Sequence, residues 1–169
     1  CKKAAGTLPA APVAVKTIVT TDLAARIAAK YGCEMREVLT GFKYIGEQIG
    51  RLEKAGHPER YILGFEESYG YLAGTYVRDK DAVVAAMLIC EMAAYYREQG
   101  KTLLDVYAAL CDELGHFKHL LVNAQFEGAA GMKTMADIME RLRSDRPTAI
   151  GGLAVIGFAD YRASFSEDY

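Results

Sequence analysis

The chain has 169 residues, of which 51% are hydrophobic, and a formal net charge of −2 at pH 7. This length suffices for one ordinary domain, or for one domain and part of another, and the apolar content excludes a disordered chain. A charge this close to neutral, without a basic patch, argues against nucleic acid as a partner.

Cysteine spacing and the apolar runs narrow the class of protein further. No two of the four cysteines form a C-x-x-C pair, so we expect reduced thiols rather than a disulfide framework or structural zinc. The longest uninterrupted apolar run, Ala82 to Cys90, is about half of the ~18 residues that a membrane span requires, and the N-terminus lacks the apolar core of a signal peptide. We therefore expect a soluble, cytoplasmic protein without a membrane partner. Because Cys1 is not an initiator methionine, we also expect a piece of a longer chain.

The N-terminal residues predict the first β–α unit of a layered α/β domain. Residues 1–12 are small, basic and interrupted by proline, as is typical of a linker. Val13 to Val19 is rich in β-branched residues and predicts a strand. Thr20-Thr21-Asp22 offers side chains that cap a helix over Leu23 to Tyr31, and Gly32 ends this helix.

A second helix and strand follow. Apolar residues at positions i, i+3, i+7 and i+10 predict a helix over Phe42 to Leu52, and Tyr61 to Phe65 is the next expected strand. A short segment, Met35 to Leu39, leads to Thr40, so Thr40 and Glu66 are both expected in turns at strand ends. Open α/β sheets place their ligands in such turns.

The C-terminal part of the chain predicts mainly helices. Asp81 caps a helix over Ala82 to Arg97, which is apolar nearly all round and is therefore expected to be buried on several sides. The remaining expected elements are a helix from Thr102, an extended strand over His116 to Glu127, an amphipathic helix over Gly128 to Arg143 and a strand over Leu153 to Phe158.

Polar side chains gather directly after the strand that ends at Phe65. In an extended segment, Glu66 and Ser68 project to the same face, where both could hydrogen-bond to hydroxyls of one sugar ring. Charge-assisted bonds of this kind contribute roughly 1.5–3 kcal/mol each. The alternative is that Glu66 caps a turn and Ser68 satisfies backbone groups. Glu67 would point the other way, with a solvated or salt-bridged surface role.

The segment Phe65-Glu-Glu-Ser-Tyr-Gly70 resembles the sugar-binding loop of the α-D-phosphohexomutases, the family of phosphoglucomutases and phosphomannomutases. In that family a Gly-Glu-x-Ser-type loop of the third of four domains grips the hexose, and Phe65 here replaces the usual glycine. Thr40-Gly-Phe-Lys-Tyr-Ile-Gly46 matches a second family element at about the expected separation. The resemblance covers most of residues 13–120 and, more loosely, the rest.

The resemblance implies a set of substrate-binding residues. It comprises Glu66, Ser68, Thr40, Gly41, Lys80 and Lys43. The hydroxyl and amide of the Thr40-Gly41 turn could hold a sugar or phosphate oxygen, and a plain helix cap by Thr40 is the alternative. For Lys43 the alternative is a solvated lysine.

Lys80 lies in Arg78-Asp-Lys-Asp81, which resembles the R-E-K-D element of the phosphoglucomutase branch. There the lysine faces the active site, contacts substrate and assists proton transfer. A charged flank before a helix is the alternative. The three histidines, His57, His116 and His119, lack metal-ligand spacing, so we assign them to structure or solvent.

The sequence lacks the family's phosphoserine loop, its Asp-Gly-Asp-x-Asp-Arg metal loop and its distal phosphate loop. The resemblance therefore implies part of a phosphohexomutase, with phosphoglucomutase favoured, that is inactive alone and binds no metal itself. Mg²⁺ and hexose 1,6-bisphosphate would bind the full-length protein. The expected partners are a hexose phosphate substrate and the remaining domains.

The expected fold is a three-layer α/β domain with a short mixed sheet between helices, followed by a partial α+β segment. After the linker, residues 13–122 would form the sugar-binding domain and residues 123–169 the incomplete start of a C-terminal domain. Three other functions stay open: a phosphomannomutase or phosphopentomutase, a noncatalytic sugar-phosphate-binding module, and an unrelated α/β interaction domain.

Overall fold

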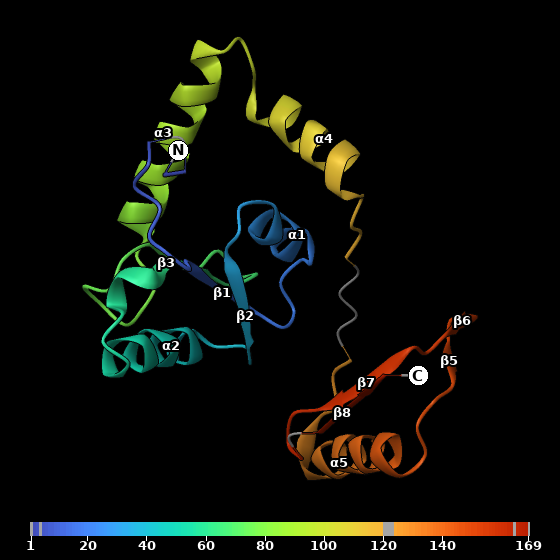
Figure 1. The fold of residues 1–169 in the computed structure, drawn as a ribbon. Coiled ribbons are helices and arrows are strands. Elements are labelled where there is room, and N and C mark those ends of the chain that lie inside the picture. The colour runs from blue at the N-terminus through green and yellow to red at the C-terminus, as the bar shows by residue number, and fades with distance from the viewer. Residues whose placement is uncertain (1, 4, 120–123, 164, 169) are drawn as a thin grey trace. The chain divides into compact units, whose positions relative to one another are not determined.

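A computed structural model describes residues 2–3, 5–119, 124–163 and 165–168. The chain forms two compact units, residues 1–119 and 120–169 (Figure 1). Within the described residues, none of the helices is both long and apolar enough to cross a lipid bilayer.

A four-stranded mixed sheet forms the centre of the first unit. Its strands are β1 (Val13–Thr17), β2 (Glu34–Val38), β3 (Tyr61–Phe65) and β4 (Tyr71–Leu72), in the order β2-β1-β3-β4. β1 pairs in parallel with β2 and β3, whereas β4 is antiparallel to β3. Because the carboxyl ends of parallel strands share one edge, the segments after β1, β2 and β3 all begin at that edge.

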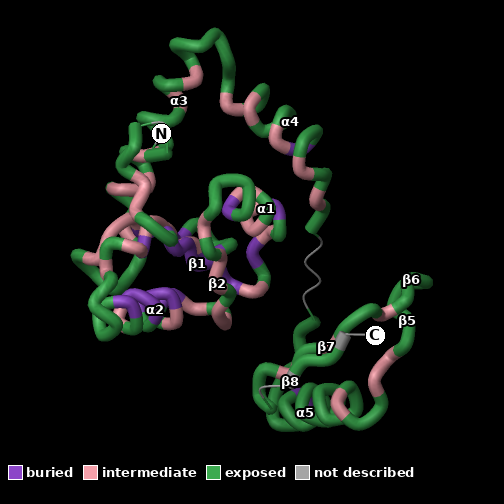
Figure 2. The backbone as a smooth tube through the Cα atoms, viewed as in Figure 1, coloured by how far each residue is buried: buried purple, intermediate pink, exposed green. Residues whose placement is uncertain are grey.

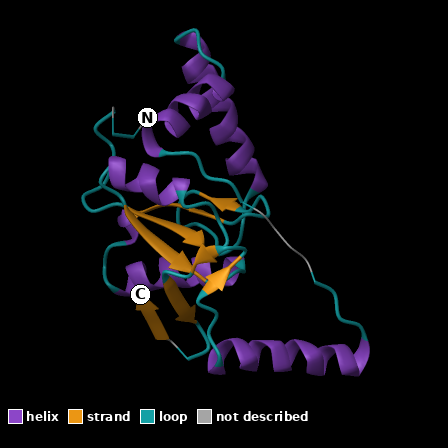
Figure 3. Ribbon diagram, turned by 90° about the vertical axis from the view of Figure 1, so that its right-hand side faces the viewer, coloured by secondary structure: helices purple, strands orange, loops and turns teal. Residues whose placement is uncertain are grey.

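Helices α1 (Leu23–Lys30) and α2 (Phe42–Lys54) cover opposite faces of this sheet (Figures 1 and 3). Val13 and Val15 of β1 pack against Ile45 and Ile49 of α2 in the main hydrophobic core. Burial of each such aliphatic side chain contributes about 1.5–3 kcal/mol. The expected three-layer arrangement, with a short mixed sheet between helices, is confirmed. A short 3₁₀-helix, η1 (Pro58–Arg60), leads from α2 into β3.

Two further helices, α3 (Ala82–Glu98) and α4 (Leu103–Leu114), complete the first unit. The predicted cap at Asp81 is present, and the helix expected from Thr102 has Thr102 as its N-cap residue. The Asp81 carboxylate accepts hydrogen bonds from the amides of Val83 and Val84, and Thr102 and Asp105 cap α4 reciprocally.

The predicted burial of α3 is wrong within this unit. None of its residues is buried, and Val83 is 78% exposed (Figure 2). α3 contacts chiefly β4 and α4, and these elements cover only part of its circumference. An apolar pattern all round a helix reports the composition of its surface, not whether neighbouring segments cover it.

The second unit holds α5 (Gly128–Ser144) and two antiparallel hairpins, β5 (Ala149–Ile150) with β6 (Leu153–Ala154) and β7 (Gly157–Asp160) with β8 (Phe165–Asp168). An ion pair of 2.7 Å between Arg143 and Asp160 joins α5 to β7 and lowers the pKa of the Asp160 carboxyl.

Two expected strands differ from those observed. The strand expected over His116 to Glu127 is absent from residues 116–119 and 124–127, and residues 120–123 lie outside the described residues. The strand expected over Leu153 to Phe158 is divided, because its two ends pair with different partners, β5 and β8. The predicted helix between them is confirmed as α5.

Candidate functional site

A cavity of about 460 Å³ lies beside the segments that follow β1 and β3, and we call it the polar cavity because the carboxylates of Glu66 and Glu67 lie in its lining. Its lining combines carboxylates, hydroxyls and an imidazole with aromatic and aliphatic side chains: Val19, Thr20, Thr21, Leu63, Phe65, Glu66, Glu67, Tyr69, Tyr71 and His119. Pockets of roughly 300–1,000 Å³ with a few convergent polar groups bind small ligands in other proteins.

The polypeptide turns sharply after β3, between Glu66 and Gly70. The Glu66 amide donates a hydrogen bond of 2.9 Å to the Gly70 carbonyl, and Tyr69 adopts a φ of +63°. This segment is therefore a turn, which we call the 66–70 turn, and the extended geometry expected for Glu66 and Ser68 is wrong. Glu66 is buried, with 5% exposed, whereas Ser68 is exposed.

The position of Glu66 depends on Gly70. A Cβ atom at Gly70 would lie 2.6 Å from Oε1 of Glu66, well inside the contact distance. Glycine therefore leaves the space that the carboxylate occupies. This accounts for the glycine that ends the motif.

Lys80 reaches the Glu66 carboxylate. Its Nζ lies 2.8 Å from Oε1 of Glu66, and the Glu66 side chain is almost fully buried whereas 53% of the Lys80 side chain is exposed. The hydrogen bond to Glu66 raises the pKa of Lys80, so the amine stays protonated. A buried carboxylate requires such a partner, because a buried charge without one is strongly destabilising.

The segment that carries Lys80 is fixed from two sides. On one side α2 approaches it so closely that a Cβ atom at Gly46 would lie 2.7 Å from the Arg78 carbonyl oxygen, and Arg78 forms an ion pair with Glu53. On the other side the Asp81 amide donates a hydrogen bond of 2.8 Å to the Tyr71 carbonyl. These contacts orient the Lys80 side chain towards the 66–70 turn.

Glu67 is bonded to the end of β1. The Thr17 hydroxyl donates a hydrogen bond of 2.7 Å to Oε2 of Glu67, and Thr17 and Thr20 share a hydrogen bond of 2.8 Å. This contact between Thr17 and Glu67 could not be foreseen from the sequence, because the two residues are 50 positions apart.

A buried lysine next to Thr17 holds the surrounding loops. Nζ of Lys16 lies 3.0 Å from the Thr20 carbonyl, 3.1 Å from Asp22 and 3.0 Å from Glu37. The sequence suggested that residues 20–22 cap α1. Asp22 instead binds Lys16 and makes no side-chain cap bond, whereas the Thr21 hydroxyl accepts a hydrogen bond of 3.2 Å from the Leu23 amide. In the sequence, Lys16 is recognisable as a charged residue within a run of strand-forming residues.

Three predicted residues lie apart from the cavity. Thr40 is exposed at the end of β2, and Gly41 rather than Thr40 is the N-cap residue of α2. Nζ of Lys43 lies 4.8 Å from the centroid of the Tyr44 ring. All three follow β2, which β1 separates from β3.

Of the six residues predicted for the site, Glu66 belongs to the lining of the cavity, and Lys80 is paired to it. Among the predicted structural histidines, His119 also belongs to the lining, while His57 and His116 lie near the carboxylates of Glu59 and Asp112. No group of three or more His, Cys, Asp or Glu side chains in the described part of the chain could hold a metal ion.

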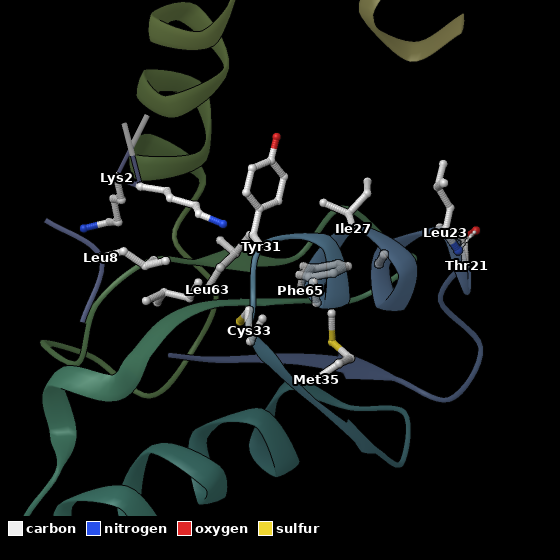
Figure 4. A pocket seen from close by; sticks show the side chains of 15 residues that line it. Lys2, Leu8, Thr21, Leu23, Ile27, Tyr31, Cys33, Met35, Leu63 and Phe65 are labelled. Atoms are coloured by element: carbon white, nitrogen blue, oxygen red, sulfur yellow. Dashed lines mark hydrogen bonds between the residues drawn. The ribbon is translucent and has the colours of Figure 1, made fainter. Parts of the chain in front are cut away.

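A second cavity, of about 470 Å³, opens on the α1 face of the sheet (Figure 4). Apolar side chains such as Leu8, Ile27 and Met35 line most of it, and burial raises the pKa of the Cys33 thiol there. It offers few polar groups to orient a ligand, so the polar cavity is the better candidate for a functional site.

Residues 1–114 match the family model described as phosphoglucomutase/phosphomannomutase, alpha/beta/alpha domain III. A phosphoglucomutase of Staphylococcus haemolyticus is 35% identical over 164 residues, which cover 95% of this chain and 29% of that protein. A phosphoglucomutase of Staphylococcus epidermidis is 38% identical over 154 residues, with 90% and 28% covered. The chain thus spans less than a third of the length of these curated relatives.

The fold has a counterpart among solved structures. The open form of parafusin, a phosphoglucomutase from Paramecium, matches with a TM-score of 0.56 at 20% identity. The match covers 92% of this chain and 27% of that structure. At this identity the likeness concerns the fold alone.

Proposed function

This chain belongs to the phosphoglucomutase/phosphomannomutase family, and from this we propose that it supplies the sugar-binding site of a phosphoglucomutase. The full-length enzyme would interconvert hexose 1-phosphate and hexose 6-phosphate through a bisphosphate. The observation that carries the proposal is the buried Glu66 carboxylate, paired with Lys80, in the wall of a polar cavity at the strand ends.

Glu66 can bind sugar hydroxyls without losing its ion pair. Lys80 occupies Oε1, and Oε2 has no hydrogen-bond partner among the side chains that the structure describes. An ionised carboxylate accepts several hydrogen bonds, so Oε2 can accept from hexose hydroxyls. The aromatic rings of Tyr69 and Tyr71 in the same lining offer apolar surfaces for the C–H face of the sugar.

Lys80 would act chiefly as a cation, because a raised pKa makes its ammonium group a weaker proton donor. Because its pKa is raised, the amine is protonated and cannot serve as a base while it is paired with Glu66. A half-exposed ammonium group at the cavity can attract the phosphate of the substrate and stabilise its charge. Ser68, Thr40, Gly41 and Lys43 remain proposed contacts with the substrate, supported by their place at the same sheet edge.

The family reaction also implies Mg²⁺ and hexose 1,6-bisphosphate. The side chains described here do not fit Mg²⁺, since they contain no cluster of three or more candidate ligands. We therefore place the metal site and the phosphoserine in other parts of the full-length protein. On this proposal, the chain alone binds sugar but does not turn it over.

A coupled mutase assay on the full-length protein with Mg²⁺ tests the proposal. Glucose 1-phosphate, mannose 1-phosphate and ribose 1-phosphate are compared, and glucose 1-phosphate is expected to be preferred. Glu66→Ala should reduce kcat/KM at least about 100-fold, because it removes charge-assisted hydrogen bonds and the partner of Lys80. Glu59→Ala, which removes an exposed carboxylate in η1, is the matched control.

The outcomes separate the candidate functions. Preference for mannose 1-phosphate or ribose 1-phosphate would assign a phosphomannomutase or phosphopentomutase instead. Absence of turnover together with sugar-phosphate binding would assign a noncatalytic binding module. Absence of both, from a folded full-length protein, would overturn the proposal.

A further inference from the structure

Thr17, the last residue of β1, carries a buried hydroxyl that is bonded to two residues of the cavity lining, Thr20 and Glu67. Its side chain is fully buried, at 0% exposed. Its backbone is held by the sheet, because Thr17 pairs with Val38 of β2 and the next amide, of Ile18, donates to the Val38 carbonyl. The hydroxyl is therefore attached to a rigid part of the unit.

The two hydrogen bonds of this hydroxyl have a fixed direction. The ionised carboxylate of Glu67 can only accept, so the single proton of Thr17 is donated to Oε2 of Glu67 at 2.7 Å. The 2.8 Å contact between Thr17 and Thr20 must then be donated by Thr20. The result is a chain from Thr20 through Thr17 to Glu67, which joins the two segments that line the cavity.

The 66–70 turn connects the paired strands β3 and β4, which fix its two ends, but few bonds fix the residues between them. Its internal bond joins the Glu66 amide to the Gly70 carbonyl, and Tyr69, with a φ of +63°, is 88% exposed. Among the side-chain bonds of the described residues, two tie this turn to the rest of the unit: Lys80 to Glu66 and Thr17 to Glu67. Lys80 itself lies on an exposed segment, whereas Thr17 lies in the sheet.

We propose that Thr17 is a positioning residue for the sugar site: acting through Glu67, it fixes the 66–70 turn so that Glu66 faces the cavity. This inference rests on the proposed sugar-binding function. Glu67 is exposed, as the sequence suggested, and the inference adds a structural role for its bond to the buried Thr17 hydroxyl. It also leaves the lone pairs of Thr20 as the acceptors that a sugar hydroxyl would meet.

The test uses the full-length protein with Mg²⁺ and glucose 1-phosphate. Thr17→Val keeps the shape of the side chain and removes the hydroxyl, and Thr17→Ser keeps the hydroxyl. Thr17→Val should raise KM about tenfold with a smaller change in kcat, and Thr17→Ser should stay within about twofold of the wild type. Thr102→Ala is the control, because it removes the exposed N-cap of α4 and lowers stability without a change in KM.

Glu67→Ala removes the same bond from its exposed end and should raise KM to the same extent. The Thr17→Val/Glu67→Ala double variant should be no worse than either single variant, because both remove one interaction. If Thr17→Val does not fold, Glu67→Ala decides the question. A wild-type KM in Glu67→Ala, or additive effects in the double variant, would overturn the inference.

Failure of the proposed function can be distinguished from failure of this inference, because the wild-type protein itself would then show no turnover. In that case hydrogen exchange at the Glu66 amide, which is bonded to Gly70, still tests the positioning role. Exchange should be about tenfold faster in Glu67→Ala than in the wild type. Equal exchange rates would overturn the inference independently of catalysis.

Discussion

The ammonium group of Lys80 lies 2.8 Å from Oε1 of Glu66, and this contact joins two motifs that are 14 residues apart. Glu66 is buried at the end of a core strand, whereas Lys80 extends from an exposed segment before α3. The pair thus combines a buried acceptor with a cation whose side chain is half exposed. Such an arrangement suits a site where a sugar must bind and its phosphate must be neutralised.

Removal of Lys80 should destabilise the first unit. Lys80→Met leaves the Glu66 carboxylate buried without its cation, and this costs free energy even though the exposed amine is partly screened by water. We expect the melting temperature to fall by about 2–4 °C, measured by circular dichroism. Glu66→Gln/Lys80→Met, which removes both charges, should recover most of the loss. Equal melting of Lys80→Met and wild type would contradict a stabilising ion pair.

A methyl group at Gly70 should displace the Glu66 carboxylate. The added Cβ of Gly70→Ala would lie 2.6 Å from Oε1, so either the carboxylate or the 66–70 turn has to move. We expect kcat/KM for glucose 1-phosphate to fall about 10- to 100-fold in the full-length protein. Gly50→Ala serves as control, because a Cβ there meets nothing within 4 Å. Equal activity of the two variants would show that Glu66 does not require its observed position.

The elements that the sequence predicted well depend on local patterns. The apolar spacing of Phe42, Ile45, Ile49 and Leu52 reports one helix face, and these four residues all enter the main core with the valines of β1. The cap at Asp81 and the helix start at Thr102 are likewise decided within a few residues. Such features need no knowledge of distant parts of the chain.

The site was only partly predictable, because its contacts are long-range or depend on backbone conformation. Glu66 was identified by its motif, but the spacing of Glu66 and Ser68 was read for an extended segment and the chain forms a turn there. The bond between Thr17 and Glu67 requires β1 and β3 to be neighbours, which follows from sheet order and not from either motif. The prediction that α3 is buried was wrong for a similar reason, since composition does not reveal which neighbours cover a helix.

Replacement of Gly46 or Gly50 in α2 by alanine should change the free energy of unfolding in opposite directions. Gly46→Ala would place a Cβ 2.7 Å from the Arg78 carbonyl oxygen, a backbone atom that cannot move without the Lys80 segment. We expect a loss of about 1–3 kcal/mol in the free energy of unfolding. Gly50→Ala meets no atom and should stabilise the helix by about 0.5–1 kcal/mol. Urea unfolding of both variants measures the difference, and equal effects would argue against close packing of α2 on the Lys80 segment.

The contribution of the Asp81 cap of α3 to stability should decrease at low pH. A hydrogen bond from Tyr76, followed by those from the amides of Val84 and Val83, lowers the pKa of Asp81 below its ordinary value of 3.8. The folded state therefore favours the ionised carboxylate, and its contribution is fully present above pH 3.8. As the pH falls through the lower folded-state pKa, both states become protonated and the contribution is lost.

Asp81→Asn is the variant that isolates this effect, because asparagine caps a helix equally well but does not titrate in this range. We expect the wild type to melt above Asp81→Asn near pH 6 and the difference to vanish below the pKa of the folded carboxyl. Tyr76→Phe, which removes the largest cause of the shift, should move the decline towards pH 3.8. Melting temperatures across pH 2–7 measure all three proteins, and a pH-independent difference would show that the Asp81 charge does not stabilise the start of α3.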